Sequence, residues 1–176
     1  MSNTNNGKTL KNLFDGSFYR IPDYQRGYAW EKEQLQDFWD DLLNSADNKH
    51  YTGVLSLEKV SDKEKEKPQW ANDLAAKNGE AYYIVDGQQR LTTSVILLKV
   101  ILDFIGDNER FVGKKTQSLR EQYIGIEAQS GEKHYFFGYT FDNPSYEFLK
   151  TQIFEEKLVF SKIFYIKAKE VFILKI

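Results

Sequence analysis

The sequence contains no cysteine among its 176 residues, and only 3 prolines and 2 histidines. Disulfides and thiolate metal sites are therefore excluded. The chain also lacks an excess of basic residues, because 24 lysines and arginines against 26 acids give a net charge of -2. Domains that hold nucleic acid by electrostatics alone carry a broad positive excess. We therefore expect DNA to be involved only indirectly, through another domain.

A long hydrophobic run is also missing. The most apolar stretch, residues 95–105, is interrupted by Lys99 and Asp103 and is shorter than the ~20 residues that a membrane span needs. Residues 1–7 are polar and have neither the basic nor the apolar region of a signal peptide. These features predict no membrane association and a cytoplasmic location.

Hydrophobic residues make up 41% of the chain and aromatic residues 15%, which is typical of a folded protein with a sizeable core. The length favours one domain. Apolar periodicity, glycine and proline predict the following elements: a helical turn at 10–14, strands at 18–21, 53–60, 81–85, 135–137, 139–141 and 158–166, and helices at 31–45, 91–105 and 144–156. Strands 53–60 and 81–85 are expected to pair as antiparallel neighbours.

The segment between those two strands is strongly charged. Residues 61–67 contain three acids and three lysines, and residues 68–79 show little periodicity. Such a pattern favours a solvated loop without chemistry.

The most specific stretch is IVDGQQRLTT at residues 84–93, where a short strand runs through Asp86 and Gly87 into a helix. A sharp strand-to-helix turn directs free backbone N–H groups and the positive end of the helix dipole at one spot, which suits a phosphate. Arg90 and the hydroxyls of Thr92 and Thr93 are expected around that spot. Asp86 supplies a carboxylate for a metal ion.

A purely structural interpretation remains open for this turn. Asp86 and Gly87 suit tight turns, and Gln88 and Gln89 would then cap the helix. That interpretation explains Arg90 poorly, because a cation in the first helical turn opposes the helix dipole unless an anion is bound there.

A second motif, PDYQRGYAW at residues 22–30, follows the first predicted strand. Its Arg26 lies between aromatic residues, an arrangement in which a guanidinium can stack and also bind phosphate oxygens in a bidentate manner. The alternative is an aromatic loop packed on the core, which we favour for Trp30, while the roles of Tyr24 and Tyr28 stay open. Together the two motifs predict one anion-binding pocket that Arg26 and Arg90 both face.

The ordered motifs IPDYQRGYAW at 21–30 and VDGQQRLTT at 85–93 resemble the amino-terminal domain of GmrSD-type modification-dependent restriction endonucleases. Residues 143–150 are similar to a later segment of that family, so the likeness covers about residues 8–160. The resemblance implies an α+β fold of the ParB and sulfiredoxin type, a small mixed sheet with packed helices. It also implies a nucleoside triphosphate site at the Asp-Gly-Gln-Gln-Arg turn, in a system that cleaves phage DNA through a separate nuclease domain.

The resemblance further implies a role for each residue of the turn. Asp86 would position a divalent cation, expected to be Mg²⁺. Gly87 would let the backbone approach the phosphates, and Gln88 and Gln89 would donate amide hydrogen bonds or orient the attacking water. Arg90 would neutralise phosphate charge. The implied catalytic residues are thus Asp86, Gln88, Gln89 and Arg90, and the implied nucleotide-binding residues are Tyr24, Gln25, Arg26, Tyr28, Gly87, Arg90, Thr92 and Thr93.

The chain departs from longer members of this family in two ways. Their histidine-asparagine-histidine nuclease core is not expected here, since His50 and His134 stand in unrelated contexts. The family-like domain is expected to cover residues 1–166, and residues 167–176 are lysine-rich and apolar without a clear cap, as in a truncated or irregular end.

Two functions from different classes follow. In the first, the chain binds and hydrolyses a nucleoside triphosphate in a metal-dependent reaction that governs a separate nuclease. In the second, it is a non-enzymatic sensor or interaction module whose pocket binds a nucleotide or a DNA phosphate.

Overall fold

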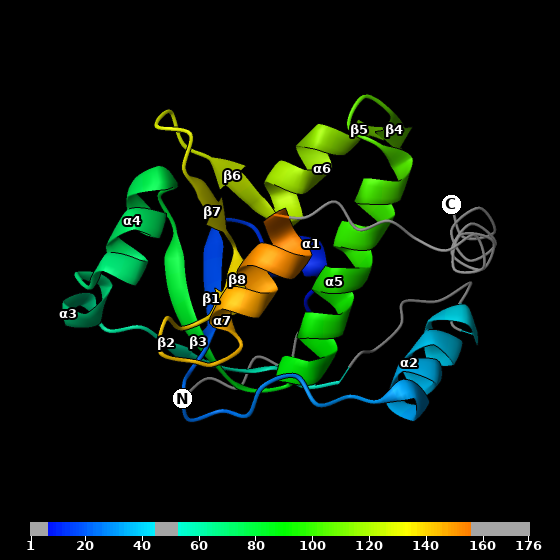
Figure 1. Ribbon diagram of the computed structural model, residues 1–176, viewed down its shortest axis with the longest axis horizontal. Helices are drawn as coiled ribbons and strands as arrows, with labels where there is room; N and C mark the ends of the chain where they lie inside the picture. Colours follow the sequence, from blue (N-terminus) through cyan, green and yellow to red (C-terminus); the bar gives the residue numbers. More distant parts are fainter. Residues whose placement is uncertain (1–6, 45–52, 156–176) are drawn as a thin grey trace.

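The computed structural model describes residues 7–44 and 53–155 of the chain (Figure 1). Its main sheet is mixed, with the strand order β2-β3-β1-β8. Strand β1 is parallel to both of its neighbours, and β2 is antiparallel to β3, as predicted. The strands are β1 (Ser17–Ile21), β2 (Ser56–Lys59), β3 (Glu80–Asp86) and β8 (Phe137–Tyr139). The predicted α+β class with a small mixed sheet is confirmed.

Helices cover both faces of this sheet. In Figure 1, α3 and α4 lie on one side of it, α5 and α6 lie on the other, and α2 lies at the periphery. The helices are α1 (Leu10–Leu13), α2 (Lys32–Asn44), α3 (Asp62–Lys65), α4 (Pro68–Ala76), α5 (Gln88–Ile105), α6 (Thr116–Tyr123), α7 (Tyr146–Phe148) and the π-helix η1 (Leu149–Glu155). Two small antiparallel ribbons pair β4 (Arg110–Phe111) with β5 (Lys114–Lys115), and β6 (Gly125–Glu127) with β7 (Lys133–Tyr135).

The core lies against β1, a central strand with helices on both of its sides. Phe18 and Ile21 of this strand are fully buried, as are Trp70 from α4 and Leu102 from α5. Burying a large apolar side chain stabilises a fold by about 1.5–3 kcal/mol. A parallel strand covered on both faces is expected to be almost continuously apolar, which makes the buried Arg20 on β1 an exception.

The prediction of a structureless loop over residues 61–79 is wrong, because α3 and α4 occupy most of it. Ser61 caps α3 by accepting a hydrogen bond from the Glu64 backbone N–H (3.3 Å). Pro68 stands at the start of α4, where its fixed φ favours a helix. The burial of Trp70 then anchors α4 on the sheet.

The remaining predictions differ mainly at their boundaries. Helix α5 begins at Gln88 instead of residue 91, because the two glutamines and Arg90 form its first turn, and it ends before Gly106 as predicted. The helix predicted over residues 144–156 is present as α7 followed by η1. The strand predicted at 158–166 and the irregular end at 167–176 lie outside the described residues.

Candidate functional site

The candidate site is built on the turn between β3 and α5. Strand β3 ends at Asp86, and Gly87 adopts φ +86° before α5 begins at Gln88. This left-handed conformation favours glycine. A Cβ at position 87 would also lie only 2.8 Å from the Val54 carbonyl oxygen. Gly87 is therefore required both by the turn and by the segment that crosses over it.

Asp86 lies at the exposed end of β3. Its Oδ1 accepts a hydrogen bond from the Gly87 backbone N–H at 2.8 Å. The structure shows no ion pair between Asp86 and a cation of residues 7–44 or 53–155. Its carboxylate is thus accessible from solvent, beside the first turn of α5.

The two sequence motifs are held together by side-chain amides. The Nε2 atom of Gln25 donates to the Val85 carbonyl (3.0 Å), and that of Gln88 donates to the Arg26 carbonyl (3.2 Å). Gln89 uses both ends of its amide: Nε2 donates to the Gly27 carbonyl (3.1 Å), and Oε1 accepts from the Ala29 backbone N–H (2.9 Å). The 22–30 loop is therefore fastened along the start of α5.

The two glutamines of the turn differ in which of their side-chain amide atoms have a hydrogen-bond partner. Both are buried, each with 8% of its surface exposed. The Nε2 and Oε1 atoms of Gln89 each bond the loop backbone, whereas the Oε1 atom of Gln88 is buried and accepts from no described group. A buried amide oxygen without a donor costs about 1–3 kcal/mol. This atom is thus an acceptor for a water molecule or a bound group.

Both arginines of the predicted pocket are exposed. The guanidinium of Arg90 lies against Gly53, where a Cβ would be 2.7 Å from Nη1. Within residues 7–44 and 53–155, neither Arg26 nor Arg90 pairs with a carboxylate. Two cations near the N-terminus of a helix are unfavourable without an anion. That the two side chains face one cavity stays a prediction.

The threonines of α5 have partners within the protein. The Thr92 hydroxyl donates to the Gln88 carbonyl (2.7 Å), and the Thr93 hydroxyl donates to the Gln89 carbonyl (2.8 Å) and lies 2.9 Å from the Tyr28 hydroxyl. Only 1% of the surface of Thr92 is exposed. These hydroxyls tie the second turn of α5 to its first, and a role for them in nucleotide binding remains untested.

The aromatic residues of the loop fall into two groups. Trp30 packs on Phe38 of α2, with ring centroids 5.6 Å apart, which confirms the packing role expected for it. Tyr24 is 68% exposed and Tyr28 38% exposed. Partial burial raises the pKa of Tyr28, and its hydrogen bond with Thr93 lowers it by less. Of these aromatics, Tyr24 is the one most accessible for stacking on a base.

Sequence analysis assigned no role to Asn143, which fixes the entry of the loop. Its Nδ2 donates to the carbonyls of Pro22 (3.0 Å) and Gln25 (3.3 Å), and its Oδ1 accepts from the Ser145 backbone N–H (2.9 Å). A Cβ on Gly27 would lie 2.5 Å from the Ser145 Oγ. The signal was present as an asparagine before proline, but its partners are more than 100 residues away.

Among the described residues there is no group of three or more histidine, aspartate or glutamate side chains placed to hold a metal ion. Asp23, in the 22–30 loop, accepts from the Tyr24 backbone N–H (2.9 Å). His134 is buried beside Asp73, while His50 lies outside the described residues.

No helix in the described ranges is long and apolar enough to cross a membrane.

The sequence of the chain matches a known protein family. Residues 10–173 match the family described as the N-terminal domain of the GmrSD restriction endonuclease, so the chain belongs to this family. No curated protein matches the chain significantly. Membership makes the chain part of a restriction system, which serves phage defence, and implies a partner nuclease domain.

Proposed function

We propose that the chain binds a nucleoside triphosphate with Mg²⁺ at the turn between β3 and α5 and hydrolyses it. The observation that carries this proposal is that an exposed carboxylate, Asp86, ends β3 directly before α5, and that Arg90, in the first turn of α5, is exposed and pairs with no carboxylate of the described residues. A triphosphate would supply the anion that Arg90 and the positive end of the α5 dipole require. Hydrolysis would then govern DNA cleavage by the partner nuclease domain.

The residues of the turn divide the chemistry among them. Asp86 would hold Mg²⁺, an ion that keeps several waters and needs only one or two carboxylates beside phosphate oxygens. The absence of a prebuilt carboxylate cluster among the described residues is compatible with that mode of binding. Arg90, with Arg26 from the facing loop, would neutralise the charge that spreads over the transferred phosphoryl group.

Gln88 is the better candidate of the two glutamines for orienting the attacking water. Its Oε1 is an unfilled acceptor in the first turn of α5, whereas both ends of the Gln89 amide are bound to the loop backbone. Gln89 would act by positioning the loop that carries Arg26. The two substitutions Gln88→Ala and Gln89→Ala should therefore fail differently, the first in turnover and the second in binding as well.

The proposal is tested by calorimetric titration of the purified chain with ATP, GTP, CTP and UTP, with and without Mg²⁺, together with assays of phosphate release. We expect one nucleotide to bind in a Mg²⁺-dependent manner and Asp86→Ala to abolish hydrolysis. The matched control is Asp15→Ala, an exposed aspartate just before β1, at the opposite end of the sheet from Asp86. Undiminished turnover in Asp86→Ala would contradict the proposal, and binding without turnover would favour a nucleotide sensor instead.

A further inference from the structure

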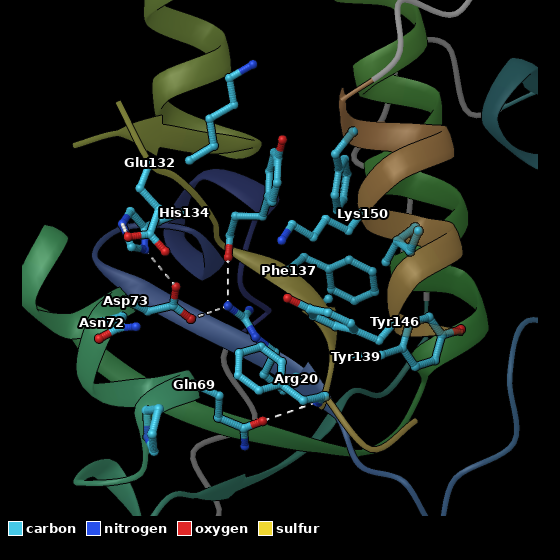
Figure 2. A pocket seen from close by; sticks show the side chains of 17 residues that line it. Arg20, Gln69, Asn72, Asp73, Glu132, His134, Phe137, Tyr139, Tyr146 and Lys150 are labelled. Carbon is cyan, nitrogen blue, oxygen red and sulfur yellow. Dashed lines mark hydrogen bonds and ion pairs between the residues drawn. The ribbon is translucent and has the colours of Figure 1, made fainter. Parts of the chain in front are cut away.

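A second cavity lies away from the motif-bearing turn. It has a volume of about 80 Å³ and is bounded by β1, α4, β7, β8 and η1 (Figure 2). A single water molecule needs about 10–15 Å³ of such volume, so the cavity has room for several waters or one small polar group. None of the residues implied in nucleotide binding lines it.

The inner end of this cavity is a buried ion cluster. Arg20 and Asp73 form an ion pair, and the Nδ1 atom of His134 lies 3.1 Å from the other oxygen of Asp73 (Figure 2). All three residues are at least 93% buried. The Arg20 guanidinium also lies over the Trp70 ring, 5.4 Å from its centroid. Such a cluster fixes the position of the guanidinium.

One edge of that guanidinium is left open toward the cavity. Nη2 donates to Asp73 and to the Tyr135 carbonyl (3.0 Å), and Nη1 donates to the Tyr19 carbonyl (2.9 Å). Nε donates to no group in residues 7–44 or 53–155. The neighbouring wall is Gly138, where an added Cβ would lie 3.9 Å from both Nε and Nη1. The absence of a side chain at position 138 keeps this donor edge accessible.

Lys150 brings a second cation to the same cavity. It extends from η1 into the cavity, on the side opposite Asp73 (Figure 2). Its ammonium lies 5.7 Å from the centroid of the Tyr146 ring. In the described part of the chain no carboxylate pairs with it. Asp73 is already paired with Arg20, and Glu132, the other carboxylate that lines the cavity, lies 3.9 Å from Nε2 of His134, so neither of them pairs with Lys150.

The remaining walls are aromatic. Tyr135 stacks on Phe154 with ring centroids 4.7 Å apart, and its hydroxyl is buried without a described partner. Phe141 is 52% exposed and meets Tyr146 edge to face at 4.8 Å. Aromatic surface of this kind favours a planar ring.

We propose that this cavity is a second ligand site, which binds a small molecule that carries an oxyanion on a planar ring. Lys150 and the open edge of Arg20 bind the oxyanion, a phosphate or a carboxylate, by charge-assisted hydrogen bonds. The ring lies against the aromatic wall. The site does not depend on nucleotide binding at the turn between β3 and α5.

Calorimetric titration with phenyl phosphate, benzoate and inorganic phosphate tests the proposal and separates the two oxyanions. We expect one saturable site, which binds phenyl phosphate or benzoate about tenfold more tightly than inorganic phosphate because the ring adds stacking energy. Lys150→Gln, which removes one charge-assisted contact, should weaken binding of the preferred probe about tenfold or more. Gly138→Ala, whose methyl group meets only ordinary contacts, should weaken binding by covering the Arg20 edge.

Two controls locate the effect. Lys63→Gln removes the same charge from an exposed site on α3, and Arg90→Ala disables the turn between β3 and α5; neither should change the affinity. Thermal melting checks that each variant is folded. If Gly138→Ala does not fold, the result for Lys150→Gln decides the test. The proposal would be overturned if none of the probes showed saturable binding up to about 10 mM. An affinity unchanged by Lys150→Gln would overturn it as well.

Discussion

The motif-bearing turn and the Arg20 cavity place charged groups in opposite environments. At the turn, Asp86, Arg26 and Arg90 are exposed and have no described ion pairs, so their charges cost the fold little and remain available. In the cavity, Arg20 and Asp73 are buried and bound to each other. A buried charge is tolerated only when it is paired and hydrogen-bonded. The same residue types therefore remain accessible to a ligand at the turn, while in the cavity they stabilise the fold.

The largest expected effect contrasts the two aspartates. Asp73→Ala leaves the guanidinium of Arg20 buried without its counter-charge, and we expect it to lower the free energy of unfolding by about 3–5 kcal/mol. Asp86→Ala, at an exposed turn, should lower it by less than about 0.5 kcal/mol. Urea denaturation of the two variants measures both values. Equal losses would remove the distinction between the two regions.

A smaller effect is expected from the residue that ties the loop to the rest of the fold. Asn143→Ala removes the side-chain donor to two carbonyls: that of Pro22 keeps the Gln25 backbone N–H, whereas that of Gln25 is left without a described donor, which should cost about 1–3 kcal/mol. Limited trypsin digestion, followed by mass spectrometry, should show faster cleavage after Arg26 than in the wild type. The matched control is Asn12→Ala on the exposed helix α1. An unchanged cleavage rate in Asn143→Ala would show that the contacts between the loop and the β3–α5 turn hold the loop without Asn143.

The same contrast explains how much the sequence could predict. The turn is contiguous: strand, Asp86, Gly87 and helix follow one another, so their geometry is set by local rules and was predicted apart from the first turn of α5. The cavity combines Arg20, Asp73, His134 and Lys150 from four separate elements. No spacing in the chain relates them, because tertiary packing alone brings them together.

The error over residues 61–79 has a different origin, since its signals were local. Ser61 and Glu64 have the spacing of a capping box, and Pro68 stands at a favourable first helical position. The charge run obscures them, because alternating charges also favour a solvated loop. Asp73 lies on the helix that was missed, so the Arg20 pair could not be anticipated.

Alkaline pH should lower the stability of the fold modestly through its buried tyrosines, of which Tyr135 lines the cavity. Burial raises the pKa values of Tyr19, Tyr83 and Tyr135 from 10.0 to about 12. These tyrosines stay protonated in the folded state after they ionise in the unfolded chain, so their stabilising contribution is intact below pH 10.0 and is lost between 10.0 and about 12. Denaturation with urea from pH 8 to pH 12 follows this loss.

Tyr135→Phe makes that measurement specific to the cavity. The hydroxyl of Tyr135 is buried without a described partner, so its removal should change stability little at neutral pH. At alkaline pH the variant should lose less stability than the wild type, because one of the raised pKa values is gone. A large loss at neutral pH would mean that the hydroxyl is bonded in solution, and a wild-type alkaline profile would show that the ionisation of Tyr135 does not contribute.

The smallest expected effect concerns DNA, for which neither region is suited. The turn offers the exposed Arg90, and the adjoining loop offers the exposed Arg26, whereas even non-specific duplex binding, with Kd of roughly 10⁻⁴ to 10⁻⁶ M, requires several neutralised phosphates along a surface. The net charge of -2 adds no general attraction. We expect no change in fluorescence anisotropy when the isolated chain is titrated into unmodified or base-modified duplexes at physiological salt. A salt-sensitive, sub-micromolar affinity that Arg90→Ala removes would instead assign the exposed cations of the turn to DNA phosphates, and the chain would then be a sensor rather than a nucleotide hydrolase.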